Sequence, residues 1–295
     1  MANDETNAGR HLNGRMNDRP SPGALEHGLR EAGYVAGPHL AKMISLGCTM
    51  PRPILLEGPA GVGKTSLAAA LAEVLERDIV RLQCYEGITA DQALYEWNYH
   101  KQFAALTVDK SSDVFTSEYL LERPLMRALN RPSVLLIDEV DRADEGFEAL
   151  LLEFLGEYTI SVPEWKTVHA EVPPVVLLTS NRTRPLSDAL RRRCLFYRFE
   201  WPEEVQEHEI VSSHVPELPE SEMQMVVKAV RALRTWNLIK PPGVAECIDW
   251  AKALSLETGG WSLDFASQTI GCVVKDVLDM EVVAKRLKEL FSGET

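Results

Sequence analysis

Eight consecutive residues combine glycines, a lysine and a hydroxyl group at a spacing that suits polyphosphate binding. The run is Gly58-Pro59-Ala60-Gly61-Val62-Gly63-Lys64-Thr65, followed by Ser66. Glycines let backbone N–H groups turn inward toward phosphates, and a following helix adds its positive end. Lys64 is expected to reach the terminal phosphates and Thr65 to offer its hydroxyl to Mg²⁺. The alternative is a glycine turn without a ligand, which the strand–loop–helix context disfavours.

A second chemical feature is the acidic pair Asp138-Glu139, which directly follows the apolar run 134–137. Ligands of parallel sheets bind beyond the carboxyl ends of the strands, so we expect this pair to lie near the phosphate loop. Asp138 would then join Thr65 as a Mg²⁺ ligand, and Glu139 would orient or deprotonate an attacking water. A solvated acidic loop is the alternative, since Asp141, Asp144 and Glu145 follow closely. Together the two features indicate binding of ATP and Mg²⁺.

The elements that position these residues predict an α/β fold. Short apolar runs that predict strands alternate with helical spacing, which is typical of a parallel sheet covered on both faces. The predicted strands are 54–57, 78–84, 134–137, 175–179 and 195–200. The predicted helices of this part include 25–46 in two pieces, 66–77, 89–107, 118–129 and 146–155, with a β-hairpin over 159–172. Beyond Trp201-Pro202 only helices are expected, over 203–214, 220–236, 244–257, 263–278 and 280–290.

The domain prediction is therefore a disordered tail at 1–24, an αβα domain with a parallel five-stranded sheet at 25–200, and an all-helical domain at 201–295. Segments near 88–110 and 157–172 are expected to be insertions in the αβα domain. The chain has 295 residues and a net charge of −13, which disfavours a general nucleic-acid binder.

The five cysteines form no Cys-x-x-Cys pair and predict a reducing compartment rather than a disulfide framework. No apolar run is long enough to span a bilayer, and the polar N-terminus has no signal-peptide core. These features predict a cytoplasmic protein. Peripheral attachment to the inner face of the membrane stays open.

With these motifs in place, the chain resembles the AAA+ ATPases, whose fold adds a helical lid to a P-loop domain. The resemblance implies that Asn181, which lies two residues after the strand 175–179, helps to place the lytic water. It implies that Gln83, at the end of the strand 78–84, is the polar residue that links the state of the catalytic site to the pore of the ring. It also implies that Arg193, with Arg192 as second choice, is an arginine finger acting on the nucleotide of the next subunit in a homo-oligomeric ring, most simply a hexamer.

One departure concerns the lid. The family places an arginine near the third lid helix, but the matching stretch Lys240–Glu246 contains none. Arg231, Arg234 or Lys240 could compensate.

Within the family, the segments 88–110 and 157–172 resemble insertions of the MoxR-type subgroup. The phrases 82–87, 95–99, 121–124 and 241–250 are similar to the accessory ATPases of carbon monoxide dehydrogenase. The resemblance implies a chaperone that helps to mature a metalloenzyme, such as the Cu–S–Mo centre of a molybdenum-containing carbon monoxide dehydrogenase. It also implies a partner with a von Willebrand A domain. No nucleic-acid partner is expected, because the net charge of −13 disfavours one.

Three alternatives remain. One is a nucleotide-gated scaffold that turns ATP over slowly or not at all. Another is a MoxR-type activator of a different enzyme, for example a nitric oxide reductase or Rubisco. The third is a DNA-acting relative, because the run 190–194 also resembles clamp loaders. The aromatic residues Tyr95, Trp97, Tyr99 and Phe103 are expected mainly to pack against their own domain, while Tyr85 and Trp97 could contact a client protein.

Overall fold

The computed structural model of the protein describes residues 20–291, so the predicted tail lies almost wholly outside the described residues. Five strands form one sheet in the order β2-β5-β8-β1-β9, and every neighbouring pair is parallel. Their bounds are β1 Ile54–Glu57, β2 Asp78–Gln83, β5 Ser133–Asp138, β8 Val175–Ser180 and β9 Leu195–Arg198. The predicted parallel five-stranded sheet is confirmed. All five strands end at the same edge, where the phosphate loop begins.

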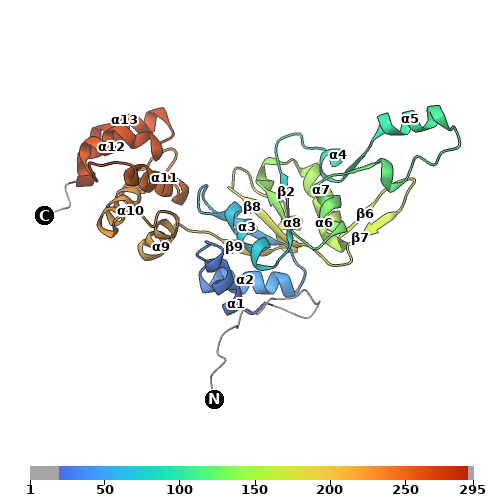
Figure 1. Cartoon of the computed structure of the whole chain (residues 1–295), viewed down its shortest axis with the longest axis horizontal. Helices are drawn as coiled ribbons and strands as arrows, with labels where there is room; N and C mark the ends of the chain where they lie inside the picture. The colour runs from blue at the N-terminus through green and yellow to red at the C-terminus, as the bar shows by residue number, and fades with distance from the viewer. Residues whose placement is uncertain (1–19, 292–295) are drawn as a thin grey trace, which may run out of the picture.

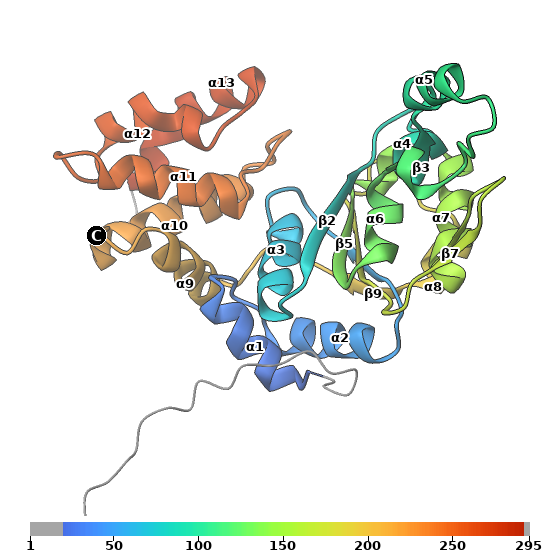
Figure 2. The same ribbon diagram turned by 45° about the vertical axis from the view of Figure 1, so that its right-hand side comes forward.

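Helices cover both faces of this sheet because its central strands are apolar on both sides. In β5, Val134 and Leu136 join one core, while Leu135 and Ile137 join the other. The first face is covered by α1 Pro22–Glu31, α2 Pro38–Thr49 and α3 Lys64–Val74. The second is covered by α6 Pro124–Asn130, α7 Glu145–Glu157 and α8 Asp188–Arg193. Figure 2 shows α3 on one side of β2 and β5, with α6 and α7 on the other.

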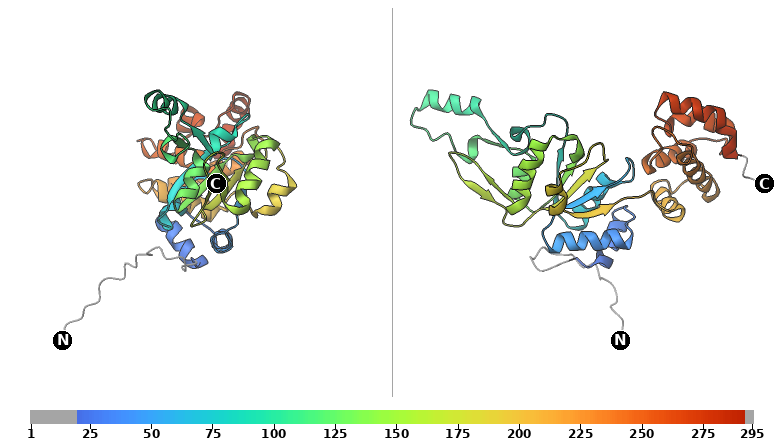
Figure 3. Two further views of the ribbon diagram at one scale, coloured as in Figure 1. Left: turned by 90° about the vertical axis from the view of Figure 1, so that its right-hand side faces the viewer. Right: turned by 180° about the vertical axis from the view of Figure 1, so that it is seen from behind.

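The described residues after Trp201 form only helices, as the sequence predicts. They are α9 Glu204–His214, α10 Glu220–Arg234, α11 Val244–Ser255, α12 Leu263–Thr269 and α13 Val277–Arg286, followed by a 3-10 turn at Leu287–Phe291. These helices, called the helical group below, share an apolar core of their own around the fully buried Trp250. Figure 3 shows this group at the end of the molecule opposite α5. A single helix over 263–278 is wrong, because the Asp276 side chain accepts the N–H of Leu278 and starts a new helix there.

The segment between β2 and β5 also differs from the prediction. Instead of helices over 89–107 and 118–129, it folds as α4 Ala90–Ala93, β3 Tyr95–Trp97, α5 Tyr99–Val108, a 3-10 turn at Ser117–Tyr119, and β4 Leu120–Glu122. Strands β3 and β4 pair antiparallel, and α5 projects from the body (Figure 1). Two local signals explain the difference: Asn98 caps α5, and Pro124 begins α6. The predicted hairpin is confirmed as β6 Thr159–Ser161 and β7 Thr167–His169.

Trp97 is only 8% exposed and packs edge-on against Phe115, with ring centroids 5.3 Å apart. The hypothesis that Trp97 contacts a client is therefore wrong, because its ring is part of the core. Tyr85 is 44% exposed and stays a candidate contact.

Across the described part of the chain, no helix has the length and apolarity to cross a membrane.

Candidate nucleotide-binding site

The phosphate loop curls between β1 and α3 through two glycines in the left-handed region. Gly61 has φ +76° and Gly63 has φ +87°, conformations that side chains with a Cβ disfavour. The Lys64 Nζ donates to the carbonyl oxygens of Gly58 and Pro59 at 2.8 and 2.7 Å. Burial lowers the pKa of Lys64 to about 8, against the opposing effect of nearby carboxylates. The loop thus holds a desolvated ammonium group at the start of a helix.

Asp138 lies beside the loop and accepts hydrogen bonds at both carboxylate oxygens. Its Oδ1 accepts from the hydroxyls of Thr65 at 3.2 Å and Thr179 at 2.5 Å, while its Oδ2 accepts from Arg81 at 2.6 Å. A carboxylate and a hydroxyl oxygen in contact fit Mg²⁺, which takes one or two carboxylates and completes its shell with phosphate and water. The predicted pair of metal ligands, Thr65 and Asp138, is thus brought together.

Glu139 follows in the left-handed region, with φ 55° and ψ 47°, which is uncommon for a residue other than glycine. Its carboxylate contacts Gln83 Nε2 at 3.0 Å, Arg142 Nε at 3.0 Å and Asn181 Nδ2 at 3.4 Å. The structure therefore joins three predicted residues from three strand ends. Strained backbone of this kind is common at functional sites, where the surrounding structure holds it in place.

Asp141 is a site residue that the sequence analysis missed. The interpretation of the acidic run as a solvated loop is wrong at this position, because Asp141 is only 2% exposed. Its carboxylate accepts from the backbone N–H of Asn181 at 3.3 Å and from the N–H and hydroxyl of Thr183, both at 2.7 Å. Burial alone would raise the pKa of Asp141, but these hydrogen bonds outweigh it and lower the pKa below its ordinary value. Asp141 therefore fixes the loop that carries Asn181.

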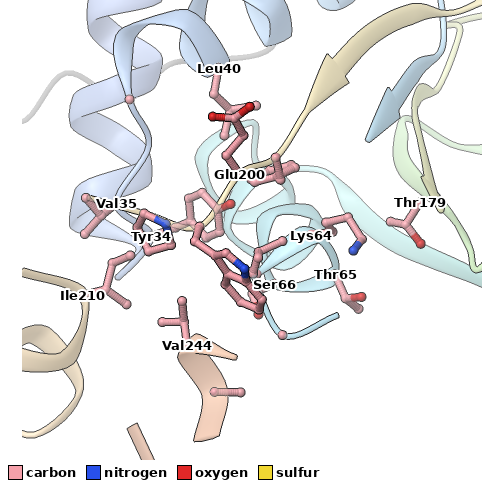
Figure 4. A pocket seen from close by; sticks show the side chains of 18 of the residues that line it. Tyr34, Val35, Leu40, Lys64, Thr65, Ser66, Thr179, Glu200, Ile210 and Val244 are labelled. Atoms are coloured by element: carbon pink, nitrogen blue, oxygen red, sulfur yellow. The ribbon is translucent and has the colours of Figure 1, made fainter. Parts of the chain in front are cut away.

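A cleft of about 810 Å³ runs from these residues to the helical group. Of the predicted site residues, those lining it are Ala60, Gly61, Val62, Gly63, Lys64, Thr65, Ser66, Asp138, Glu139 and Asn181. Gly58 and Pro59 lie outside it and instead hold Lys64 through their carbonyls. Figure 4 shows Lys64, Thr65 and Thr179 at one side of the cleft, and Tyr34, Val35 and Ile210 at the other. The volume and the separation of polar from apolar walls suit a nucleotide.

The apolar wall comes from elements to which the sequence analysis assigned no site residue. Tyr34 and Val35 lie in the turn between α1 and α2, Ile210 in α9, and Val244 at the start of α11. Nothing in the local pattern of these residues marks them, because they meet only when helices from both ends of the chain pack around the loop. The Val244 N–H donates to the Gly61 carbonyl at 3.0 Å, which joins the helical group directly to the phosphate loop.

The three consecutive arginines at the end of α8 have different surroundings. Arg191 pairs with the buried Glu57 at 3.1 Å, as does Arg182 at 3.2 Å. Arg192 and Arg193 have exposed side chains and do not line the cleft of their own chain. The Arg193 guanidinium lies close against Gly156 of α7, because a Cβ added there would come within 2.6 Å of its Nη2.

The three candidates for a lid cation do not line the cleft, and each is held by another partner. Arg234 forms a bidentate pair with the buried Glu207 at 2.8 and 2.5 Å, and Arg231 donates to the Pro202 carbonyl at 2.8 Å. Lys240 lies 3.5 Å from Asp276. The expectation that one of them compensates for the absent lid arginine is not met in this arrangement.

Comparison with known proteins agrees with this geometry. Residues 53–194 match the family described as AAA domain (dynein-related subfamily). The gas vesicle ATPase GvpN1 of Halobacterium salinarum is 28% identical over 198 residues, which cover 62% of this chain and 56% of GvpN1. Protein NorQ of Paracoccus denitrificans is 25% identical over 167 residues, which cover 54% of this chain and 57% of NorQ. The chain thus spans little more than half the length of these relatives.

Among solved structures, RuvB of Thermotoga maritima aligns with a TM-score of 0.51 at 19% identity, covering 86% of this chain and 75% of that one. At this identity the likeness concerns the fold, a parallel sheet with a phosphate loop and a helical region after it. The overall fold is therefore shared with a protein of known structure.

Proposed function

We propose that the chain is an AAA+ ATPase of the MoxR-like group, which binds ATP in this cleft and hydrolyses it to ADP and phosphate. The observation that carries the proposal is the contact of Thr65 with Asp138 at the start of α3, with Glu139 and Asn181 beside it. A phosphate chain along the loop would meet the amides of α3 and the ammonium of Lys64. Its terminal phosphate would then face Glu139.

In the proposed reaction, a water oxygen attacks the terminal phosphorus and the bond to the bridging oxygen of ADP breaks. Glu139 orients the water and accepts its proton, while Asn181 fixes the direction of attack. Thr65 and Asp138 would hold Mg²⁺, which supplies charge neutralisation on the phosphate oxygens when bound. In the structure Gln83 and Arg142 both contact the Glu139 carboxylate at 3.0 Å, and these contacts set its orientation.

A second part of the proposal is that the site is completed by a neighbouring copy of the chain. Arg193, or Arg192 beside it, would reach the terminal phosphate of the next subunit in a ring, most simply a hexamer. Their exposure and their absence from the chain's own cleft support this assignment. Arg191 suits it less, because its guanidinium is held by Glu57.

The client is a further proposal, and it rests on sequence resemblance. We infer a chaperone that uses ATP to remodel a metalloenzyme during maturation, such as a molybdenum-containing carbon monoxide dehydrogenase, together with a partner carrying a von Willebrand A domain. Activation of another enzyme, such as a nitric oxide reductase or Rubisco, is a second candidate, and a nucleotide-gated scaffold is the alternative without turnover. The proposed location is the cytoplasm, with peripheral membrane attachment as the other possibility.

The test compares three variants with the wild-type chain. Lys64→Ala should lose nucleotide binding, and Glu139→Gln should bind ATP but release no phosphate. Mixing Arg193→Ala with Glu139→Gln subunits should restore part of the turnover, because each site borrows an arginine from its neighbour. A folded wild-type chain that binds no ATP would refute the proposal. Binding with the same slow phosphate release in wild type and Glu139→Gln would favour the scaffold. A pull-down with Glu139→Gln in ATP would then identify the client.

A further inference from the structure

The guanidinium of Arg81 forms part of the polar wall of the cleft. It projects from β2, its side chain is 54% exposed, and its Nη2 donates to Asp138 Oδ2 at 2.6 Å and to Gln83 Oε1 at 2.5 Å. The parallel register of β2 and β5, with Gln83 opposite Asp138, brings Arg81 within reach of both. Arg81 also lines the cleft.

The charges that line the cleft give this arginine a specific importance. Within the described residues, the lysine and arginine side chains lining it are Lys64, Arg81 and Arg198. Arg198 ends β9, at the opposite edge of the sheet from β2. Lys64 and Arg81 are therefore the cations beside Asp138, and the three lid candidates Arg231, Arg234 and Lys240 are paired elsewhere.

We propose that Arg81 binds the terminal phosphate of ATP, supplying from the sheet the cation that the lid does not provide. The inference rests on the proposed function. The Oδ2 atom of Asp138 is held by Arg81, and its Oδ1 atom faces Thr65. A divalent cation bound by Asp138 and Thr65 competes with the guanidinium for the same carboxylate.

Arg81 is the partner free to move, because its side chain is long and more than half exposed, whereas the side chain of Asp138 is 5% exposed. The terminal phosphate of a bound ATP would be a new anion at the same edge of the sheet. A guanidinium suits this exchange because its fork of donors matches phosphate oxygens as well as a carboxylate. Gln83 contacts both Arg81 and Glu139, so it would lose its hydrogen bond to Arg81 when the guanidinium moves.

The experiment measures binding of ADP and of the β,γ-imido analogue of ATP by competition with a fluorescent nucleotide in Mg²⁺. Arg81→Met keeps the alkyl stem and removes the charge. The analogue should bind about tenfold or more weakly, as expected for a lost charged hydrogen bond, while ADP affinity changes less than twofold. The Mg²⁺ concentration that half-saturates ADP binding should also fall, because the guanidinium no longer competes for Asp138.

Arg77→Met is the matched control, since Arg77 lies just before β2 and donates to the Pro173 carbonyl, outside the cleft. It should leave both affinities unchanged. Equal losses for the analogue and ADP in Arg81→Met, or no loss for either, would overturn the inference. If the wild-type chain binds neither nucleotide, the proposed function fails instead, so the two failures are distinct.

Discussion

Replacing Gly243 by alanine tests whether the helical group senses the phosphate loop through backbone contact. Gly243 caps α11 with φ −84°, a conformation that alanine adopts freely. Its Cβ would nevertheless lie 2.8 Å from the Gly61 Cα and 3.1 Å from the Gly61 oxygen. Carbon atoms in contact normally stand about 3.5–4.0 Å apart, so the loop and α11 must separate by roughly 1 Å.

This separation should break the hydrogen bond from the Val244 N–H to the Gly61 carbonyl. The net contribution of a hydrogen bond to the free energy is about 0.5–1.5 kcal/mol, which corresponds to roughly a twofold to tenfold change in an equilibrium constant. The bond aims the Gly61 carbonyl toward α11 and so away from the phosphates. We therefore expect ADP affinity to fall about threefold to tenfold in Gly243→Ala, measured by titration with a fluorescent ADP analogue.

Two controls separate this effect from damage to the helix. Gly259→Ala places its Cβ no closer than 3.9 Å to another atom and should change nothing. Glu246→Ala removes the carboxylate that accepts the Gly243 N–H at 2.9 Å, so it weakens the helix start without crowding Gly61. If Gly243→Ala folds and binds ADP like the wild type, or if Glu246→Ala loses as much affinity, the reasoning is wrong.

Two further predictions follow from the site. Burial lowers the pKa of Lys64 to about 8, and ATP binds its protonated form. Because Lys64 loses its proton as the pH rises above this pKa, the ATP affinity measured without Mg²⁺ should fall about fivefold from pH 8 to pH 9. The phosphates are already ionised below this pH range, so they do not contribute to the change. An arginine stays charged, so Lys64→Arg should abolish the pH dependence of any binding that it retains. A wild-type affinity that does not change with pH would contradict the lowered pKa of Lys64. Asp141→Asn should slow phosphate release about tenfold while ADP affinity stays within twofold, because it loosens the loop that carries Asn181. Parallel losses of release and affinity would instead show a general disruption.

The sequence predicted the residues whose role is set by their neighbours in the chain. The phosphate loop needs only a strand, a glycine turn and a helix in succession, and Asp138 needs only a strand end. Arg81 and Asp141 could not be assigned in this way, because their contacts depend on the register of β2 beside β5 and on the loop after β8. The contact of Gly243 with Gly61 joins residues about 180 positions apart, and no local pattern encodes it.

The errors in the segment 89–129 have a different cause. Tyr95, Trp97 and Tyr99 alternate with polar residues, which fits one side of a strand as well as a helical cluster over so short a span. The antiparallel partner that decides the matter, β4, lies more than twenty residues further on. Pro124 was a usable signal, since proline at the start of α6 excludes a continuous helix across it.

The arginines of the helical group explain why contact with the phosphate loop is made by backbone. Arg234 stacks on Trp201 with its guanidinium carbon 4.4 Å from the ring centroid, and its Nε donates to the Pro242 carbonyl at 2.7 Å. It therefore ties the connection after β9 to the turn before α11, with Glu207 neutralising its charge. A residue held by these contacts orients α11 but cannot also reach a phosphate. We therefore expect any movement of the phosphate loop to reach α11 through the hydrogen bond between Val244 and Gly61, and to reach the connection after β9 through Arg234.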